Sequence, residues 1–278
     1  MAGNYHPIGV FDSGYGGLTV LRELVRALPQ YDFVYLGDNA RTPYGTRSFE
    51  VVYRYTLEAV KKLFDIGCPM VILACNTASA KALRTIQQRD LPRMAPGNRV
   101  LGVIRPSVEH AAEVSRNGHV GVLATNGTVA SHSYPVELEK WSGGKIIRTS
   151  QQACPMWVPL VENRLINTPG ADYFIRTDMN RLFEQDPAID SLILGCTHYP
   201  LLLDGIRKYL PGSRVNLIEQ GPIVAGKLAD YLQRHPEMEK RCSRGGAVAY
   251  YTTEQVELFE AQALQFMGQA VKAGRIHF

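Results

Sequence analysis

Two cysteines in matching surroundings are the residues best suited to chemistry. Residues 72–77 read ILACNT and residues 193–198 read ILGCTH, so each apolar run leads into a cysteine and two polar residues. These cysteines are Cys75 and Cys196. A thiolate is an effective base, and a thiol can return a proton. With one thiol on each face of a substrate carbon, one would remove a proton and the other would replace it. The centre would then be inverted, and the reverse reaction would exchange the roles of two like groups.

A structural interpretation competes with this one. A lone cysteine after a strand is usually a small buried apolar residue, and we expect this of Cys68, Cys154 and Cys242. Similar polar residues follow Cys75 and Cys196 in the sequence, which favours a functional pair. A Cys-His hydrolase would have no use for the second thiol.

Other polar side chains follow predicted strands. Asp12 opens a tight turn that lacks the dinucleotide-loop spacing, because Thr19 stands where the third glycine belongs. Its carboxylate is suited to binding a substrate ammonium, to assisting Cys75 or to capping a helix. His198 is placed to tune Cys196 or to transfer protons. Residues 37–45 form a polar loop that offers backbone N–H groups and the Tyr44 hydroxyl.

Short apolar runs alternate with longer amphipathic ones, which is typical of βαβ units and a parallel sheet. Strands are expected at residues 8–11, 33–36, 70–74, 100–104, 120–124, 146–149, 192–194, 214–218 and 247–252. Helices are expected at residues 17–28, 48–66, 78–88, 107–115, 127–141, 171–184, 199–210, 223–234 and 253–273. Connectors are expected at residues 91–98 and 211–212, which are rich in Pro and Gly.

The two halves repeat a layout. In each, a polar turn follows one strand and a cysteine motif follows the third, which indicates a duplicated unit. The prediction is an α/β fold of two similar domains, each a mainly parallel sheet flanked by helices, related by a pseudo-two-fold axis with the active site between them. The first domain comprises residues 1–98 plus 213–278 and the second comprises residues 99–212. Ligands of open α/β sheets bind beyond the carboxyl ends of the strands, where both cysteines fall.

Composition excludes several classes of protein. The formal charge is only +4, and no basic run is longer than a pair, so nucleic acid is not expected as a partner. The N-terminus has no signal-peptide pattern, and no apolar run is long enough to span a membrane. Five scattered cysteines, an odd number, argue against a disulfide framework and favour the reducing cytoplasm.

With these residues assembled, the chain resembles bacterial glutamate racemases from about Ile8 to the C-terminal helix. Several separated motifs in the right order make the resemblance specific. The matching segments are residues 11–20, Gly37-Asp38 with Pro43-Tyr44-Gly45, residues 74–79, residues 194–200, and Cys154-Pro155 with residues 160–162.

The resemblance implies a role for each matching residue. Cys75 would act on the D-glutamate side of Cα and Cys196 on the L-glutamate side, assisted by Asp12 and His198 respectively. Glu162 would assist from the second domain. Substrate would be bound by Asp12, Ser13, Pro43, Tyr44, Gly45, Asn76, Thr77, Thr197 and His198.

The resemblance also implies the setting of the reaction. No pyridoxal phosphate, other cofactor or metal is expected. The small-molecule substrate would be L- or D-glutamate, the D-glutamate would feed peptidoglycan synthesis, and the protein would be a homodimer.

The chain departs from the family pattern at two places: Arg105 stands where many members carry Glu, and residues 219–221 read EQG. Neither touches the cysteine motifs.

Three alternatives stay open. The first is an aspartate racemase or another two-cysteine racemase or isomerase of the same superfamily. The second is a metal-dependent hydrolase with zinc on Cys75, Cys196 and His198, although short paired ligand spacings are missing. The third is a non-catalytic two-domain protein that closes on an amino acid.

Overall fold

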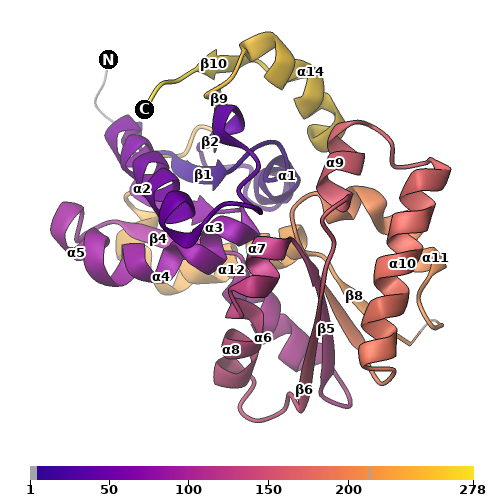
Figure 1. Cartoon of the computed structure of the whole chain (residues 1–278). Helices are drawn as coiled ribbons and strands as arrows, with labels where there is room; N and C mark the ends of the chain where they lie inside the picture. The colour runs from indigo at the N-terminus through magenta and orange to yellow at the C-terminus, as the bar shows by residue number, and fades with distance from the viewer. Residues whose placement is uncertain (1–4, 213) are drawn as a thin grey trace. The chain divides into compact units, whose positions relative to one another are not determined.

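The computed structural model describes residues 5–212 and 214–278, which form two compact units (Figure 1). The first combines the residues up to Val103 with Gly221–Phe278, and the second is Ile104–Gln220. All recorded strand pairs are parallel, and helices flank each sheet. The predicted class, α/β with two parallel sheets, is therefore confirmed. No helix in the described ranges combines the length and the apolar character needed to cross a membrane.

The first unit is built on a six-stranded sheet. In sheet order its strands are β10 (Ala273–Arg275), β9 (Val248–Thr252), β2 (Phe33–Gly37), β1 (Ile8–Asp12), β3 (Met70–Leu73) and β4 (Arg99–Gly102). Its helices are α1 (Leu18–Ala27), η1 (Asn39–Arg41), α2 (Phe49–Ile66), α3 (Asn76–Lys81), α4 (Leu83–Thr85), η2 (Ile86–Asp90), α5 (Leu91–Met94), α12 (Gln220–Arg234), α13 (Pro236–Glu239) and α14 (Val256–Met267).

The second unit is built on a four-stranded sheet. In sheet order its strands are β6 (Arg148–Ala153), β5 (His119–Ala124), β7 (Ser191–Gly195) and β8 (Asn216–Ile218). Its helices are α6 (Ile104–Val114), α7 (Asn126–Ala130), α8 (Ser133–Trp141), α9 (Trp157–Glu162), α10 (Pro169–Gln185), η3 (Tyr199–Leu202) and α11 (Leu203–Lys208).

The two sheets share one strand order. The run β2-β1-β3-β4 in the first unit matches β6-β5-β7-β8 in the second. The motif of Cys75 follows β3 and that of Cys196 follows β7, so the two cysteines occupy equivalent places in a repeated unit. The repeat inferred from sequence is therefore present in the topology.

Strand register aligns the carboxyl ends within each sheet. Asp12 of β1 pairs with Gly37 of β2, and Phe11 pairs with Leu73 of β3. In the second unit, Ala124 of β5 pairs with both Ala153 and Gly195. The segments that leave these strands therefore start from one edge of their own sheet.

Helix α2 illustrates how the local sequence sets an element. Ser48 caps its N-terminus by accepting a hydrogen bond from Val51 N at 3.3 Å, and Gly67 ends it in a left-handed conformation with φ 107°. The face that carries Val52, Ala59 and Leu63 at helical spacing is buried in the core of the first unit.

The unit boundaries differ from those expected from the sequence. The sequence places β4 at the start of the second domain, but β4 pairs with β3 of the first sheet. It places β8 in the first domain, but β8 pairs with β7 of the second sheet. Each strand extends its sheet beside the strand that precedes a cysteine, and this pairing outweighs the Pro/Gly-rich connectors on which the expectation rests. Pro92, for instance, is accommodated in the first turn of α5, where its missing N–H costs nothing.

Several expected helices are divided or end early, and in two of them the cause is local. The helix expected at 127–141 is split into α7 and α8 at His132, whose φ is 53°. A continuous helix would place Pro135 in its interior, where the proline ring clashes with the preceding turn. The last helix, expected to run to about residue 273, ends at Met267, because Gly268 adopts φ 73° and terminates it. The strand β10 that follows is not among the expected elements.

The approach of α1 to the end of β1 yields a stability prediction. A Cβ on Gly17 would lie 2.4 Å from Asp12 Cβ and 3.1 Å from Ala74 Cβ. Gly17→Ala should therefore lower the free energy of unfolding by about 1–3 kcal/mol, measured by urea denaturation. The matched control is Gly226→Ala, whose Cβ would meet nothing within 4 Å in α12. It should raise stability by up to about 1 kcal/mol, because Ala is the better helix former. Equal effects of the two substitutions would contradict the close packing at Asp12.

Candidate active site

The first half-site surrounds Cys75, which lies between β3 and α3. Cys75 is the N-cap residue of α3, and its Sγ accepts a hydrogen bond from Ala78 N at 3.4 Å. The same thiol donates to Ser13 Oγ, also at 3.4 Å. Ser13 follows β1, so the pairing of β1 with β3 brings together two predicted site residues that lie far apart in sequence. Asn76 and Thr77 begin α3 directly after the thiol and are buried.

Asp12 organises the turn that carries Ser13. Its Oδ2 accepts a hydrogen bond from Gly14 N at 2.9 Å, and the Gly14 carbonyl accepts one from the Tyr35 hydroxyl at 2.8 Å. Burial, and then the charges of Asp12 and Cys75, raise the pKa of Tyr35 well above its usual value, so this hydroxyl remains a donor. Asp12 is not the N-cap of α1, since that position is Gly17. Of its three suggested roles, helix capping is therefore wrong for α1.

The loop after β2 carries Pro43, Tyr44 and Gly45. Tyr44 is buried, and its hydroxyl donates to Asp38 Oδ2 at 2.5 Å. Burial, and then Asp38, raise the pKa of this tyrosine far above its usual range. The hydroxyl that the sequence suggests for substrate binding is thus engaged inside the first unit. Pro43 is exposed and Gly45 half-buried, which leaves the backbone as the part of this loop suited to a ligand.

The second half-site is a chain of three polar groups. Cys196 follows β7, and its Sγ lies 3.8 Å from His198 Nδ1. His198 Nε2 lies 3.0 Å from Glu162 Oε1, which α9 supplies. Thr197, between the cysteine and the histidine, is buried. The structure therefore brings Cys196, His198 and Glu162 together in one hydrogen-bonded group.

His198 has a strongly shifted pKa. Burial lowers it, but the hydrogen bonds with Cys196 and Glu162 outweigh burial and raise the pKa from 6.5 to about 10. The imidazole is therefore protonated near neutral pH. The protonated imidazole places a positive charge 3.8 Å from the Cys196 Sγ.

The other three cysteines are buried, as expected. Burial raises the pKa of Cys68 to about 12 and that of Cys242 to about 11, and it raises the pKa of Cys154 well above the usual value. In all three groups the raised pKa disfavours the thiolate.

Sequence reasoning missed two charged residues that build the first half-site. Asp38 is fully buried and accepts hydrogen bonds from Arg41 Nε at 2.7 Å and from the Thr253 hydroxyl at 2.9 Å, in addition to the one from Tyr44. One feature of the sequence could have indicated their pairing: Asp38 and Arg41 carry opposite charges three residues apart, in a loop that follows a buried strand.

Two residues at the departures from the family pattern, Arg105 and Gln220, make contacts inside the second unit. The guanidinium carbon of Arg105 lies 3.6 Å from the centre of the Trp141 ring, and its Nε lies 2.8 Å from Glu109 Oε1. Gln220 Nε2 donates to Ser107 Oγ and to the Tyr134 hydroxyl, both at 2.9 Å.

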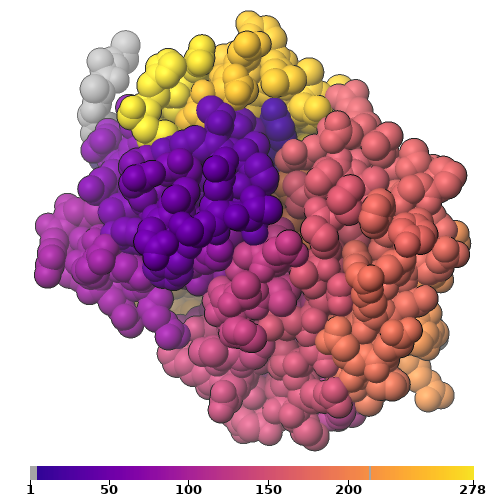
Figure 2. Space-filling view, viewed as in Figure 1, coloured from indigo at the N-terminus to yellow at the C-terminus, as the bar shows by residue number. Residues whose placement is uncertain are grey.

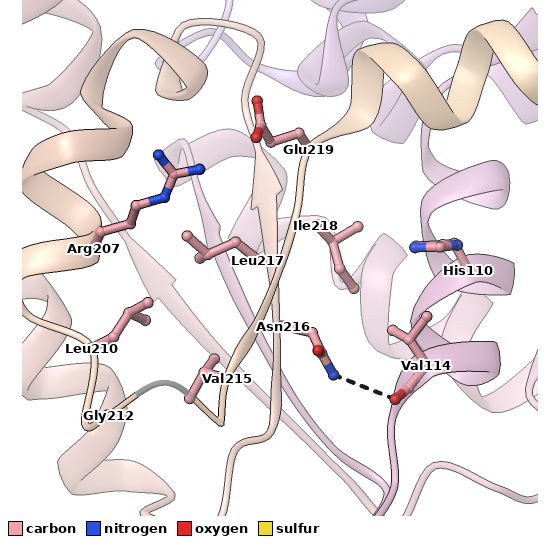
Figure 3. A pocket seen from close by; sticks show the side chains of 10 residues that line it. All are labelled: His110, Val114, Arg207, Leu210, Gly212, Val215, Asn216, Leu217, Ile218 and Glu219. Atoms are coloured by element: carbon pink, nitrogen blue, oxygen red, sulfur yellow. Dashed lines mark hydrogen bonds between the residues drawn. The ribbon is translucent and has the colours of Figure 1, made fainter.

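A pocket of about 650 Å³ lies elsewhere in the second unit, along β8 and between α6 and α11 (Figure 3). Asn216 Nδ2 donates to the Val114 carbonyl at 3.4 Å within it. None of the predicted site residues lines it. Its walls are formed by His110, Val114, Arg207, Leu210, Gly212, Val215, Asn216, Leu217, Ile218 and Glu219. Across residues 5–212 and 214–278, no group of three or more His, Cys, Asp or Glu side chains is arranged to hold a metal ion.

Comparison with known proteins defines the family. The profile of the Asp/Glu/Hydantoin racemase family matches residues 8–228, which is most of the chain. The chain belongs to this family.

Within this family, the chain is similar to proteins named as glutamate racemases. It is 42% identical to the glutamate racemase of Persephonella marina over 219 residues, covering 78% of this chain and 79% of the relative. It resembles the crystal structure of a glutamate racemase isoform from Bacillus anthracis with a TM-score of 0.88 and 35% identity, covering 99% of this chain and 98% of the other. The glutamate racemase of Francisella tularensis, solved in complex with D-glutamate, gives a TM-score of 0.84 and 30% identity, covering 96% and 95%.

The His198–Glu162 contact generates a pH prediction. Replacing the carboxylate by an amide in Glu162→Gln removes a charge that favours the imidazolium, so the pKa of His198 should fall toward its ordinary value. NMR titration of the imidazole, assigned by its loss in His198→Gln, should give a midpoint near 10 in the wild type and a lower one in the variant. An unchanged midpoint would contradict the assigned contact.

The same shift predicts how stability depends on pH. Because the folded-state pKa is raised, the protonated imidazole stabilises the fold fully below pH 6.5, and this contribution is lost as pH rises through about 10. The deficit in the free energy of unfolding of Glu162→Gln should accordingly be present at pH 6 and shrink toward pH 10, as measured by urea denaturation.

Proposed function

We propose that the chain is a cofactor-independent glutamate racemase that interconverts L- and D-glutamate through Cys75 and Cys196. The observation that carries the proposal is the placement of these cysteines at equivalent positions of two repeated sheets. Each lies beside a polar side chain, Ser13 for Cys75 and His198 for Cys196, and the imidazole of His198 is suited to proton transfer. The glutamate racemases among its relatives support the choice of substrate.

In the proposed reaction the two half-sites face each other across one glutamate. The thiolate of one cysteine takes the proton from Cα, so a C–H bond breaks and an S–H bond forms. The thiol of the other cysteine gives its proton to the opposite face of Cα, so an S–H bond breaks and a C–H bond forms. Cys75 acts on the D-glutamate side and Cys196 on the L-glutamate side. No oxidant or reductant is needed, and the next turnover runs in reverse or follows proton exchange with water.

The other site residues bind and orient the substrate in this scheme. Asp12 and Ser13 contribute beside Cys75, together with Asn76, Thr77 and the backbone of residues 43–45. Thr197 and His198 contribute beside Cys196, and Glu162 holds His198 in place. Substrate carboxylates suit N–H donors at the start of helices, and the substrate ammonium suits the Asp12 carboxylate.

The setting of the reaction forms part of the proposal. All five cysteines are free, in keeping with a reducing cytoplasm, where D-glutamate would supply peptidoglycan synthesis. We expect a homodimer, which light scattering on the purified protein would test.

Substitution of each cysteine tests the two-thiol scheme. Cys75→Ser and Cys196→Ser should each lower kcat/KM for racemisation by about 10³-fold or more, because a serine hydroxyl is far too weak an acid to exchange protons near neutral pH. The matched control is Cys242→Ser, a buried thiol whose contact with the Met238 carbonyl a hydroxyl can keep; it should retain wild-type activity. If both active-site variants remain active, a non-catalytic or one-base interpretation replaces the scheme.

Solvent isotope incorporation tests the reaction and the substrate together. In heavy water, L-glutamate should emerge as D-glutamate with deuterium at Cα, with EDTA present and no added cofactor. D-Glutamate without solvent deuterium would rule out proton exchange through the thiols. Racemisation of L-aspartate in preference to L-glutamate would favour an aspartate racemase, and loss of activity in EDTA would favour the zinc-dependent alternative.

A further inference from the structure

The first unit contains a segment that its repeat does not share. β9 and β10, from residues 248–278, extend the first sheet beyond β2, whereas the sheet of the described second unit ends at β6. Gly37, the last residue of β2, pairs with Thr252 of β9. This C-terminal segment, yellow in Figures 1 and 2, lies beside the early indigo residues of the same unit. It therefore borders the point from which the loop 38–45 departs.

The C-terminal segment bonds to that loop at its first turn. The Thr253 hydroxyl donates to Asp38 Oδ1 at 2.9 Å and its oxygen accepts from Ala40 N at 3.0 Å. On its other oxygen, Asp38 accepts from Arg41 and from the Tyr44 hydroxyl. One fully buried carboxylate thus ties β9 to both Arg41 and Tyr44.

Arg41 is fixed from two sides. Its guanidinium carbon lies 4.0 Å from the centre of the Tyr55 ring and 4.2 Å from that of the Phe278 ring. The guanidinium also pairs with Asp38 and with Glu58. Two aromatic rings set the plane of the guanidinium, and two carboxylates set its direction, so the group holds Asp38 in one orientation.

We propose that Arg41, clamped between Tyr55 and Phe278, is a positioning residue that sets the backbone of residues 43–45 for substrate binding. It acts through Asp38 and Tyr44 and touches no reacting atom. The inference rests on the proposed function in one respect, namely that the backbone of this loop contacts glutamate. Arg41, Asp38 and Phe278 all lie in the first unit, so this support of the loop belongs to the first half-site.

Steady-state kinetics separates positioning from plain stabilisation. Arg41→Met should raise KM for both enantiomers about 10-fold and lower kcat less, because the loop that binds substrate is misplaced while both thiols remain. Arg41→Lys should recover only part of this loss, since an ammonium has neither the planar stack nor the fork. Phe278→Ala, at a ring that is 47% exposed, should raise KM about 3-fold without unfolding the protein, and Phe278→Tyr should restore the wild-type KM.

The matched control is Arg89→Met. Arg89 also lies over a tyrosine ring, 4.8 Å from the centre of Tyr53, and pairs with Asp90, but it is not bonded to the loop. It should leave KM unchanged. The positioning role is overturned if Arg41→Met and Phe278→Ala lower the thermal midpoint but leave KM as unchanged as it should be in Arg89→Met.

Hydrogen exchange measured by mass spectrometry on the same proteins keeps the two proposals distinguishable. Arg41→Met should speed exchange in peptides that cover residues 38–47 and leave those around β3 unchanged. Unaltered exchange at 38–47 would overturn the positioning role whatever the kinetics. A wild-type protein that does not racemise glutamate would overturn the proposed function alone, because the exchange result still decides whether Arg41 orders the loop.

Discussion

Parallel pairing in register is the constraint on which both half-sites depend. Because β1, β2 and β3 end at one edge of their sheet, the turn after β1 and the cysteine after β3 come within hydrogen-bonding distance. The same pairing in the second unit lets α9, which follows β6, supply a carboxylate to the histidine that follows β7. A shift of one residue in either register would turn the cysteine toward the other face of its sheet, so each half-site depends on the register of its own sheet.

The two thiols sit in different electrostatic surroundings despite the shared topology. Cys75 is bonded to a neutral hydroxyl and a backbone N–H. Cys196 faces an imidazole whose pKa of about 10 keeps it charged near neutral pH, with Glu162 behind it. In the proposed reaction, the duplicated units would supply the two like acid/base groups that a reversible inversion needs, and their different partners would distinguish the two sides of the substrate.

Much of this arrangement is readable from the sequence. Alternating apolar runs predict the α/β class, and the repeated cysteine motifs predict both candidate half-sites, because strand ends and the polar residues that follow them are local features. The unit boundaries are misplaced since the partners of β4 and β8 are chosen by long-range pairing, which leaves no local mark. The support of the loop by Asp38, Arg41 and Phe278 escapes sequence reasoning for the same reason: Phe278 lies 237 residues from Arg41, and only the fold brings its ring to the guanidinium.

The central claim is that two sulfurs flank one carbon, and a crystal structure of the wild-type protein with glutamate bound measures it most directly. The account predicts Sγ of Cys75 and Sγ of Cys196 on opposite faces of Cα, each within about 4 Å of it, as proton transfer requires. Both sulfurs on the same face, or either of them out of reach of Cα in the occupied site, would contradict it.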